Sequence, residues 1–239
     1  MKRALVTGGS GAIGGAIAAQ LASDGHHVYV HANSGAARAE TIVAQIRGAG
    51  GSAEAIAFDV SDGPATEAAL IRMLAAGTIQ ILINNAGIHD DAVMPGMKRE
   101  QWSRVIDVSL NGFFNVTQPL LMPMIGTRWG RIVNISSVSA VTGNRGQTNY
   151  AAAKAGLHGA TKSLSLEVAS RGITVNTVAP GVIASPMSEE AFTKEIIDRL
   201  VPMKRAGKPE EVAALISFLA SDRAAYISGQ LISINGGMI

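Results

Sequence analysis

Short apolar runs alternate with helical stretches along the whole chain, and this alternation restricts the possible folds more than any other feature. Several runs, such as residues 79–83 (IQILI), are apolar at nearly every position. Such a strand is typical of a parallel sheet whose two faces are both covered by helices. We therefore expect an α/β fold: a doubly wound parallel sheet of about seven strands with helices on both faces.

The expected elements follow one another without a linker, an internal repeat or a low-complexity tract. The strands are expected over residues 4–7, 28–32, 53–58, 79–83, 131–135, 174–179 and 231–234. The helices are expected over residues 13–24, 36–48, 64–76, 99–122, 150–170 and 188–200, and another begins at Pro209. The helix over 99–122 should be interrupted near Asn111-Gly112 and at Pro119. Residues 1–239 are expected to form a single domain.

A glycine-rich loop directly follows the first strand and opens the first helix. It reads Gly8-Gly-Ser-Gly-Ala-Ile-Gly14. Glycines let a backbone approach a pyrophosphate, which the N-terminus of the helix attracts. Because the order is strand, loop and helix, the pattern predicts a Rossmann-type dinucleotide site formed by Gly8, Ser10, Gly11, Ile13 and Gly14. An ordinary tight turn is the alternative.

The end of the second strand bears on the choice of dinucleotide. An Asp or Glu there would bind the ribose 2′-hydroxyl of NAD, but the chain reads Ala32-Asn33-Ser34. Asn33 and Ser34 can donate hydrogen bonds to a 2′-phosphate, and Arg38 follows one helical turn later. We therefore expect NADPH (NADP+) rather than NADH as the cofactor. The alternative for Arg38 is that it only faces water.

Polar residues also end the third and fourth strands. Asp59-Val60 follows the third strand, where the carboxylate can meet an adenine amino group; an Asx turn is the alternative. The fourth strand ends in Asn84-Asn85-Ala86-Gly87. We expect these amides both to join strands and to face a ligand, with Asn85, Ala86 and Gly87 beside the cofactor.

Three residues around the fifth strand suggest acid–base chemistry. Ser137 follows that strand, and Tyr150 and Lys154 lie four positions apart at the start of the next long helix, so they share one helical face. An ammonium lowers the pKa of a nearby phenol, and a serine hydroxyl can bind both the phenol and a carbonyl. The trio can therefore protonate a ketone oxygen as a hydride arrives at carbon. Alternatively, Tyr150 caps a core helix, Lys154 faces water and Ser137 only ends a strand.

Composition excludes several other kinds of site. The chain has no cysteine, hence no disulfide and no thiolate metal site. His89-Asp90-Asp91 lacks a second histidine at a useful spacing, and we expect no metal. The net charge is only +2 and the basic residues are scattered, which argues against nucleic-acid binding. With neither a signal-peptide core nor a membrane-length apolar run, we expect a cytoplasmic protein.

Two further segments have an expected role outside the sheet. Residues 184–208 lie beyond the carboxyl end of the sixth strand and are expected to form a substrate lid. The helix over 150–170 is rich in small residues, which favours a subunit interface. Its alternative is internal packing on the sheet.

Taken together, these motifs resemble the short-chain dehydrogenase/reductase family over essentially the whole chain. The likeness rests on Thr7-Gly8 with its loop, Asp59-Val60, Asn84 to Gly87, Ser137, Tyr150-x-x-x-Lys154 and Pro180-Gly181 in the right order. Within the family, the run from Gly143 to Gly156 looks most like the reductases of 3-oxoacyl thioesters on acyl carrier protein. Acetoacetyl-CoA reductases look nearly as similar.

This resemblance implies a role for each matching residue. It implies that Tyr150 is the acid, that Lys154 lowers its pKa and holds the nicotinamide ribose, and that Ser137 positions the carbonyl. It adds Pro180, Gly181, Ile183 and Ser185 to the cofactor site. It assigns the docking of an acidic carrier protein to Arg128 and Arg171 beside the site, with exposed arginines as the alternative. It also implies a homotetramer that acts in fatty-acid or related acyl-chain biosynthesis.

The chain departs from the family pattern at two positions. Ala12 replaces the middle glycine of the loop, which can shift the path of the backbone. Ser109 stands where the family often has an asparagine that links the lysine to a water chain. Asn111 lies two helical positions away, about 200° around the helix, and cannot substitute. Ser109 is expected to hold the water instead; a weakly active, cofactor-binding partner subunit is the alternative.

Overall fold

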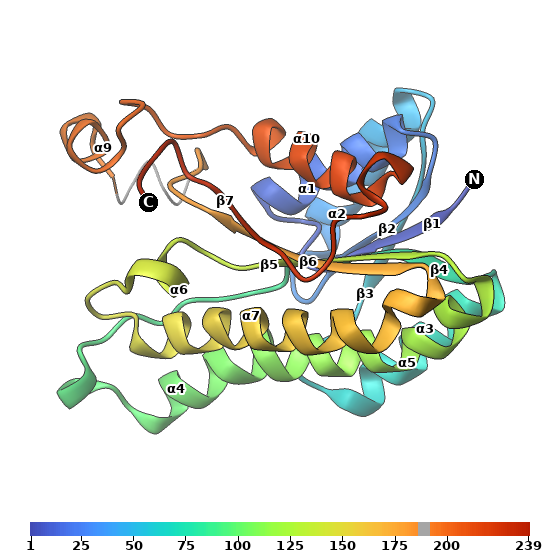
Figure 1. Cartoon of the computed structure of the whole chain (residues 1–239), viewed down its shortest axis with the longest axis horizontal. Helices are drawn as coiled ribbons and strands as arrows, with labels where there is room; N and C mark the ends of the chain where they lie inside the picture. Colours follow the sequence, from blue (N-terminus) through green and yellow to red (C-terminus); the bar gives the residue numbers. More distant parts are fainter. Residues whose placement is uncertain (186–191) are drawn as a thin grey trace.

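One parallel sheet organises the structure (Figure 1), a computed structural model that describes residues 1–185 and 192–239. Within these residues the sheet has seven strands in the order β3-β2-β1-β4-β5-β6-β7. The strands are β1 (Arg3–Val6), β2 (His27–Ala32), β3 (Ser52–Ala57), β4 (Ile79–Asn84), β5 (Gly130–Ile135), β6 (Ile173–Pro180) and β7 (Leu231–Ile234). The strand order reverses between β1 and β4, which places a ligand crevice at their carboxyl ends.

Helices cover both faces of the sheet. The α-helices of the described residues are α1 (Ala12–Ser23), α2 (Ala36–Gly48), α3 (Gly63–Ala75), α4 (Arg99–Ile106), α5 (Gly112–Thr127), α6 (Ser139–Thr142), α7 (Thr148–Val168), α9 (Lys194–Leu200) and α10 (Pro209–Ala220). In Figure 1, α1, α2 and α10 lie on one face, and α3, α5 and α7 lie on the other. The expected doubly wound parallel sheet is therefore confirmed, with most element boundaries within a residue or two of those expected.

Two apolar clusters, one on each face, explain why the central strands are apolar throughout. Ile81 and Ile83 belong to the cluster under α1, α2 and α10, whereas Leu82 belongs to the cluster under α3, α5 and α7. Because successive side chains of a strand point to opposite faces, both sets must be apolar. Leu5 of β1 lies opposite Leu82 of β4, so the second cluster continues across the strands.

The long helical segment between β4 and β5 differs from expectation at Pro119. The expected interruption near Asn111-Gly112 is a π-helical turn, Asp107–Asn111, between α4 and α5. Pro119, however, lies inside α5 without ending it. A proline removes one helical hydrogen bond, but Val116 and Leu120 are fully buried beside it. Packing against the sheet keeps the helix continuous.

The segment after β6 was expected to contain a helix over 188–200. Residues 188–191 lie outside the described residues, and α9 begins at Lys194. The two ends of this segment are joined, because Gly207 N donates to Val182 O at 2.9 Å and Ala184 N donates to Gly207 O at 2.8 Å. The short helix α6, just after Ser137, was not expected. No helix in the described part of the chain is long and apolar enough to cross a membrane.

Candidate active site

The carboxyl end of β5 places the predicted catalytic serine. Pairing between β5 and β6 continues past the strand end, since Ser136 N donates to Val178 O and Val138 N donates to Pro180 O, both at 2.8 Å. Ser137 is therefore held between two fixed backbone bonds. The chain then turns through α6 and two glycines with positive φ, Gly143 and Gly146, and returns as α7. This path brings the start of α7 back to Ser137.

Tyr150 and Ser137 meet in the structure, as the sequence predicts. A hydrogen bond joins their hydroxyl groups, and it lowers the pKa of Tyr150. Burial has the larger and opposite effect, and the negative charge of Asp91 adds to it, so the pKa of Tyr150 is raised above its ordinary value of 10.0. The phenol is consequently protonated at neutral pH, which is the state that a proton donor needs.

Lys154 is buried close to this phenol. Its side chain is 3% exposed, and its Nζ donates to Ile135 O at 2.9 Å and lies 5.9 Å from the centre of the Tyr150 ring. Burial lowers the pKa of Lys154 from 10.5 to about 8. The Tyr150 pKa is raised overall, because burial outweighs the hydrogen bond from Ser137. That Lys154 favours the phenolate stays a prediction.

Ser109 lies beside Lys154 on the π-helical turn. It is 3% exposed, and its Oγ has no hydrogen-bond partner in the described residues. A methyl group added to Gly87 would lie 2.9 Å from Lys154 Nζ and 3.6 Å from Ser109 Oγ, so the two polar atoms border one small space. Asn111 is exposed and donates to Asp107 Oδ1 at 2.7 Å. As predicted, it does not replace Ser109.

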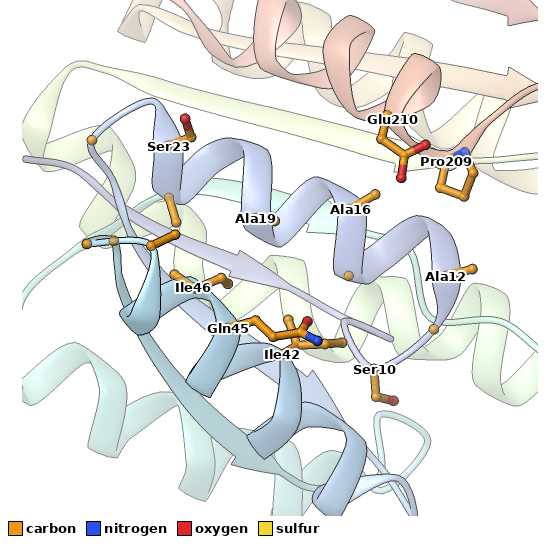
Figure 2. A pocket seen from close by; sticks show the side chains of 17 residues that line it. Ser10, Ala12, Ala16, Ala19, Ser23, Ile42, Gln45, Ile46, Pro209 and Glu210 are labelled. Atoms are coloured by element: carbon orange, nitrogen blue, oxygen red, sulfur yellow. The ribbon is translucent and has the colours of Figure 1, made fainter.

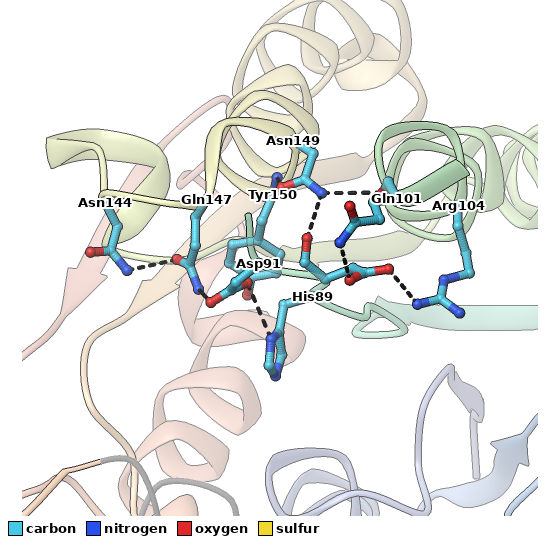
Figure 3. A network of polar contacts seen from close by, with 9 residues as sticks. His89, Asp91, Gln101, Arg104, Asn144, Gln147, Asn149 and Tyr150 are labelled. Atoms are coloured by element: carbon cyan, nitrogen blue, oxygen red, sulfur yellow. Dashed lines mark hydrogen bonds and ion pairs between the residues drawn. The ribbon is translucent and has the colours of Figure 1, made fainter. Parts of the chain in front are cut away.

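A polar network fixes the loop after β4 against the start of α7 (Figure 3). Asn149 is fully buried; its Nδ2 donates to the carbonyls of Asp90 and Gln101 at 3.0 and 3.1 Å, and its Oδ1 accepts from Tyr150 N at 2.8 Å. Asp91 accepts from Gln147 Nε2 at 2.9 Å. The sequence analysis missed Asn149, because its two carbonyl partners lie 59 and 48 residues away in the sequence.

The acidic side chains of this loop also lie close to basic side chains. His89 Nδ1 lies 3.2 Å from Asp91 Oδ1, and Asp90 pairs with Arg104 on α4 at 2.5 Å. The described residues contain no group of three His, Cys, Asp or Glu side chains arranged to hold a metal ion.

The glycine loop forms a tight backbone cradle at the N-terminus of α1. Gly8 has φ +62°, and a methyl group on it would lie 2.9 Å from Asn85 Nδ2. That amide donates to Thr7 O and Gly8 O at 3.0 and 3.1 Å, so Asn85 joins β1 to β4, as expected. No side chain caps the N-terminus of α1, which leaves its N–H groups for an anion. The cradle therefore fits a pyrophosphate.

The first departure from the family pattern lies on the surface of this loop. Ala12 is exposed, and its methyl group points outward from α1 (Figure 2). Its effect on the loop path stays a prediction. A groove with a volume of about 890 Å³ lies along α1 and α2 and reaches Glu210 at the start of α10; Figure 2 shows Ser10, Ala12 and Ser23 along it. Its lining residues do not include Ser137, Tyr150 or Lys154.

A guanidinium group and a hydroxyl group lie close together beside the end of β2. A methyl group added to Gly35 would lie 2.8 Å from Ser10 Oγ and 3.1 Å from Arg38 Nη2. Arg38 is exposed but turns back toward the glycine loop, next to the exposed Asn33 and Ser34. Ser10 and Arg38 can both donate hydrogen bonds to an anionic group placed there.

The remaining predicted cofactor residues end the neighbouring strands. Asp59 Oδ1 accepts from Ser61 N at 2.9 Å and Ser61 Oγ at 2.7 Å, and these bonds lower its pKa. The Asx turn of the alternative is therefore present, and the contact of Asp59 with adenine stays a prediction. Val60 is buried, and Ala86 packs against the same apolar cluster. Pro180, Gly181, Ile183 and Ser185 follow one another from the end of β6, and Ile183 pairs with Gly207.

The two arginines expected beside the site lie elsewhere. Arg128 ends α5 and Arg171 precedes β6, so both are exposed at the edge where β5 and β6 begin. Arg128 Nη2 donates to Ser170 O at 3.3 Å, which keeps the two segments together. Ser137 lies at the opposite end of β5, roughly 20 Å away for six residues of strand. Within one chain the two arginines therefore lie on the same end of the sheet, opposite Ser137, Tyr150 and Lys154.

Comparisons with known proteins agree with this geometry. The family model described as short chain dehydrogenase matches residues 2–196. A 3-oxoacyl-[acyl-carrier-protein] reductase of Staphylococcus aureus is 44% identical over 99% of this chain and 98% of its own length. One from Aggregatibacter actinomycetemcomitans is 43% identical over 98% of each chain. An acetoacetyl-CoA reductase of Cupriavidus necator is 43% identical over 98% of this chain and 97% of its own.

Proposed function

The chain belongs to the short-chain dehydrogenase family, and from this premise we propose that it catalyses the NADPH-dependent reduction of 3-oxoacyl thioesters to 3-hydroxyacyl thioesters. It is an oxidoreductase that acts on carbonyl and hydroxyl groups. The observation that carries the proposal is the meeting of Ser137 and Tyr150 beside the buried Lys154 at the carboxyl end of β5. The named activities of the relatives support the substrate class.

The cofactor of this family is a nicotinamide dinucleotide, and we choose NADPH because Ser10 and Arg38 converge beside the end of β2. When bound, NADPH supplies the hydride. The glycine loop and the N-terminus of α1 hold the pyrophosphate. The other residues assigned to the cofactor are Asn33, Ser34, Asp59, Val60, Asn85, Ala86, Gly87, Tyr150, Lys154, Pro180, Gly181, Ile183 and Ser185. Residues 184–208 form the lid, of which 186–191 lie outside the described residues.

The side chains of this protein manage the proton. Ser137 Oγ accepts from Ser139 N at 3.1 Å and has its own proton to donate to the substrate carbonyl. Tyr150, protonated through burial, gives its proton to the developing alkoxide. The Lys154 ammonium stabilises the phenolate that remains. We place a water between Lys154 Nζ and Ser109 Oγ, because both atoms border one small space and Ser109 Oγ has no partner among the described residues. This water relays a proton from solvent back towards the phenolate.

Removing the phenol hydroxyl tests this assignment. Tyr150→Phe should lower kcat by at least about a hundredfold, the usual contribution of a positioned acid, and leave the Kd for NADPH nearly unchanged. Tyr226→Phe is the matched control, because Tyr226 is fully exposed. Turnover is measured as NADPH absorbance with acetoacetyl thioesters. A near-normal kcat for Tyr150→Phe would exclude this tyrosine as the acid, and activity of the purified chain alone would exclude the partner-subunit alternative.

The carrier of the acyl group is a separate question. We propose acyl carrier protein, with acetoacetyl-CoA as the second candidate because a reductase of that substrate is 43% identical. Arg128 and Arg171 form one exposed basic pair suited to an acidic carrier. Alanine at either position should raise KM for the carrier-bound substrate but not for acetoacetyl-CoA. Arg72→Ala, at an exposed position of α3, is the control and should change neither KM. Turnover with CoA alone would favour the second candidate.

We further propose a cytoplasmic homotetramer that serves fatty-acid or related acyl-chain synthesis. Large apolar side chains are exposed on α5 and α7, with Phe114 62%, Met122 73% and Leu166 84% exposed. Association of these helices would cover them. Because the arginine pair lies at the far edge of its own sheet, a carrier docked there would serve the site of a neighbouring subunit. Light scattering on the wild type and on Leu166→Glu tests the assembly; a monomeric wild type would refute it.

A further inference from the structure

A buried histidine connects the segments that form the dinucleotide site. His31 lies on β2 and is 1% exposed. Its Nδ1 accepts a hydrogen bond from Gly8 N at 3.1 Å, and its Nε2 lies 2.9 Å from Phe58 O. Because the N–H of Gly8 can only donate, Nδ1 carries no proton, and Nε2 must donate to the carbonyl. His31 is therefore a neutral imidazole of one defined tautomer.

These two bonds join three parts of the cofactor surface. Gly8 begins the loop for the pyrophosphate, His31 lies near the end of β2 beside the ribose, and Phe58 precedes Asp59 on the adenine side. The loop also presses directly on β2, since a methyl group on Gly9 would lie 3.2 Å from His31 N. The ring of Phe58 packs against the imidazole with centroids 4.1 Å apart.

We propose that His31 is a positioning residue for the dinucleotide, and that its protonation releases Gly8 and so weakens cofactor binding in acid. A proton on Nδ1 would face the N–H of Gly8, donor against donor, and the bond would be lost. The loop that places the pyrophosphate would keep its hydrogen bonds from Asn85 to Thr7 O and Gly8 O but lose its hydrogen bond to β2 at Gly8. This inference rests on the proposed function, because it assumes a bound dinucleotide.

The electrostatic surroundings favour the neutral ring. Burial lowers the pKa of His31 below 6.5, while the bond to Phe58 O and the charge of Asp59 oppose this fall. Asp59 is the charged group that faces the ring, from the loop after β3, and its carboxylate is itself bound by Ser61. Above pH 6.5 the ring is neutral and the loop is fixed. As the pH falls through the lowered pKa, the ring gains a proton and the contact is lost.

Two variants separate the loss of a hydrogen-bond acceptor at position 31 from the titration of its side chain. In His31→Asn the amide oxygen takes the place of Nδ1 and accepts from Gly8, but it does not titrate. In His31→Leu no acceptor remains. The Kd for NADH and for NADPH is measured by cofactor fluorescence from pH 8 down to about pH 4.5, because the pKa of His31 lies below 6.5. Melting temperatures are recorded for each protein over the same range. NADH is the cleaner probe, because the 2′-phosphate of NADPH titrates near pH 6 itself.

At pH 8 the Kd of His31→Asn should match that of the wild type, and the Kd of His31→Leu should be about tenfold higher. On acidification the Kd for NADH should rise in the wild type and stay flat in His31→Asn. Equal pH dependence in these two proteins would overturn the inference alone, even if His31→Leu fails to fold. A purely structural role would lower melting temperatures with every Kd unchanged. A folded wild type that binds neither cofactor would overturn the proposed function as well.

Discussion

The buried ammonium of Lys154 should make this protein less stable than a variant that lacks it. Burial lowers the pKa of Lys154 from 10.5 to about 8. In the unfolded chain the same amine is solvated and binds its proton more tightly. The folded state therefore carries an energetic cost for keeping this group charged at neutral pH. Lys154→Met removes the charge and keeps most of the apolar stem.

The size of the effect follows from the two pKa values. A tenfold change in proton affinity corresponds to about 1.4 kcal/mol, so the ammonium costs about 3 kcal/mol at pH 7. The variant deprives Ile135 O of its donor, at 2.9 Å, which costs about 1 kcal/mol. Lys154→Met should thus be more stable by about 2 kcal/mol, or roughly 4–8 °C in Tm for a chain of this length.

The pH dependence of the free energy of unfolding tests the direction of the predicted effect. Between pH 8 and pH 10.5 the unfolded state binds more protons at this site than the folded state, so wild-type stability rises with pH in that window. The advantage of Lys154→Met should therefore be full at pH 7 and disappear near pH 10. Urea unfolding of cofactor-free protein at both pH values measures it. Lys162→Met, exposed on the same helix, is the matched control and should change little.

A variant no more stable than the wild type at pH 7 would refute the reasoning. So would a gain of equal size at pH 7 and pH 10, because the benefit would then not come from the charge. Catalysis should be lost in either case, since Lys154 has been assigned to the phenolate and the cofactor. Stability would then be gained at the expense of function, as is common for buried charges in active sites.

Three further outcomes are expected. Arg38→Ala should raise the Kd for NADPH about tenfold, the loss of one charge-assisted contact, and leave NADH binding unchanged in a fluorescence titration; equal effects on both would refute the 2′-phosphate site. Ser109→Ala should lower kcat severalfold without changing the Kd for NADPH, and an unchanged kcat would exclude the proposed water position. Asp62→Ala should cost about 1 kcal/mol in urea unfolding, because Asp62 caps α3 through Ala65 N at 3.0 Å; no loss would exclude the cap.

Much of the fold was predictable because its signals are local. Apolar runs and glycine loops mark strand ends directly, and the spacing of Tyr150 and Lys154 places both on one helical face. Pro119 misled the prediction, since its effect depends on what packs beside the helix. The short helix α6 has too few residues for a periodic pattern. Residue patterns therefore located the elements and predicted that Ser137, Tyr150 and Lys154 lie close together.

What depended on the tertiary structure were the properties set by contacts distant in sequence. The raised pKa of Tyr150 depends on burial, which no local pattern reports. Arg128 and Arg171 lie at the far edge because both precede their strands, and that edge has meaning only once the sheet is formed. His31 reads as one more residue of an apolar strand until Gly8 and Phe58 meet it. The sequence by itself determined the elements and the chemistry available, whereas desolvation and long-range hydrogen bonds, which need the folded sheet, decided how that chemistry is tuned.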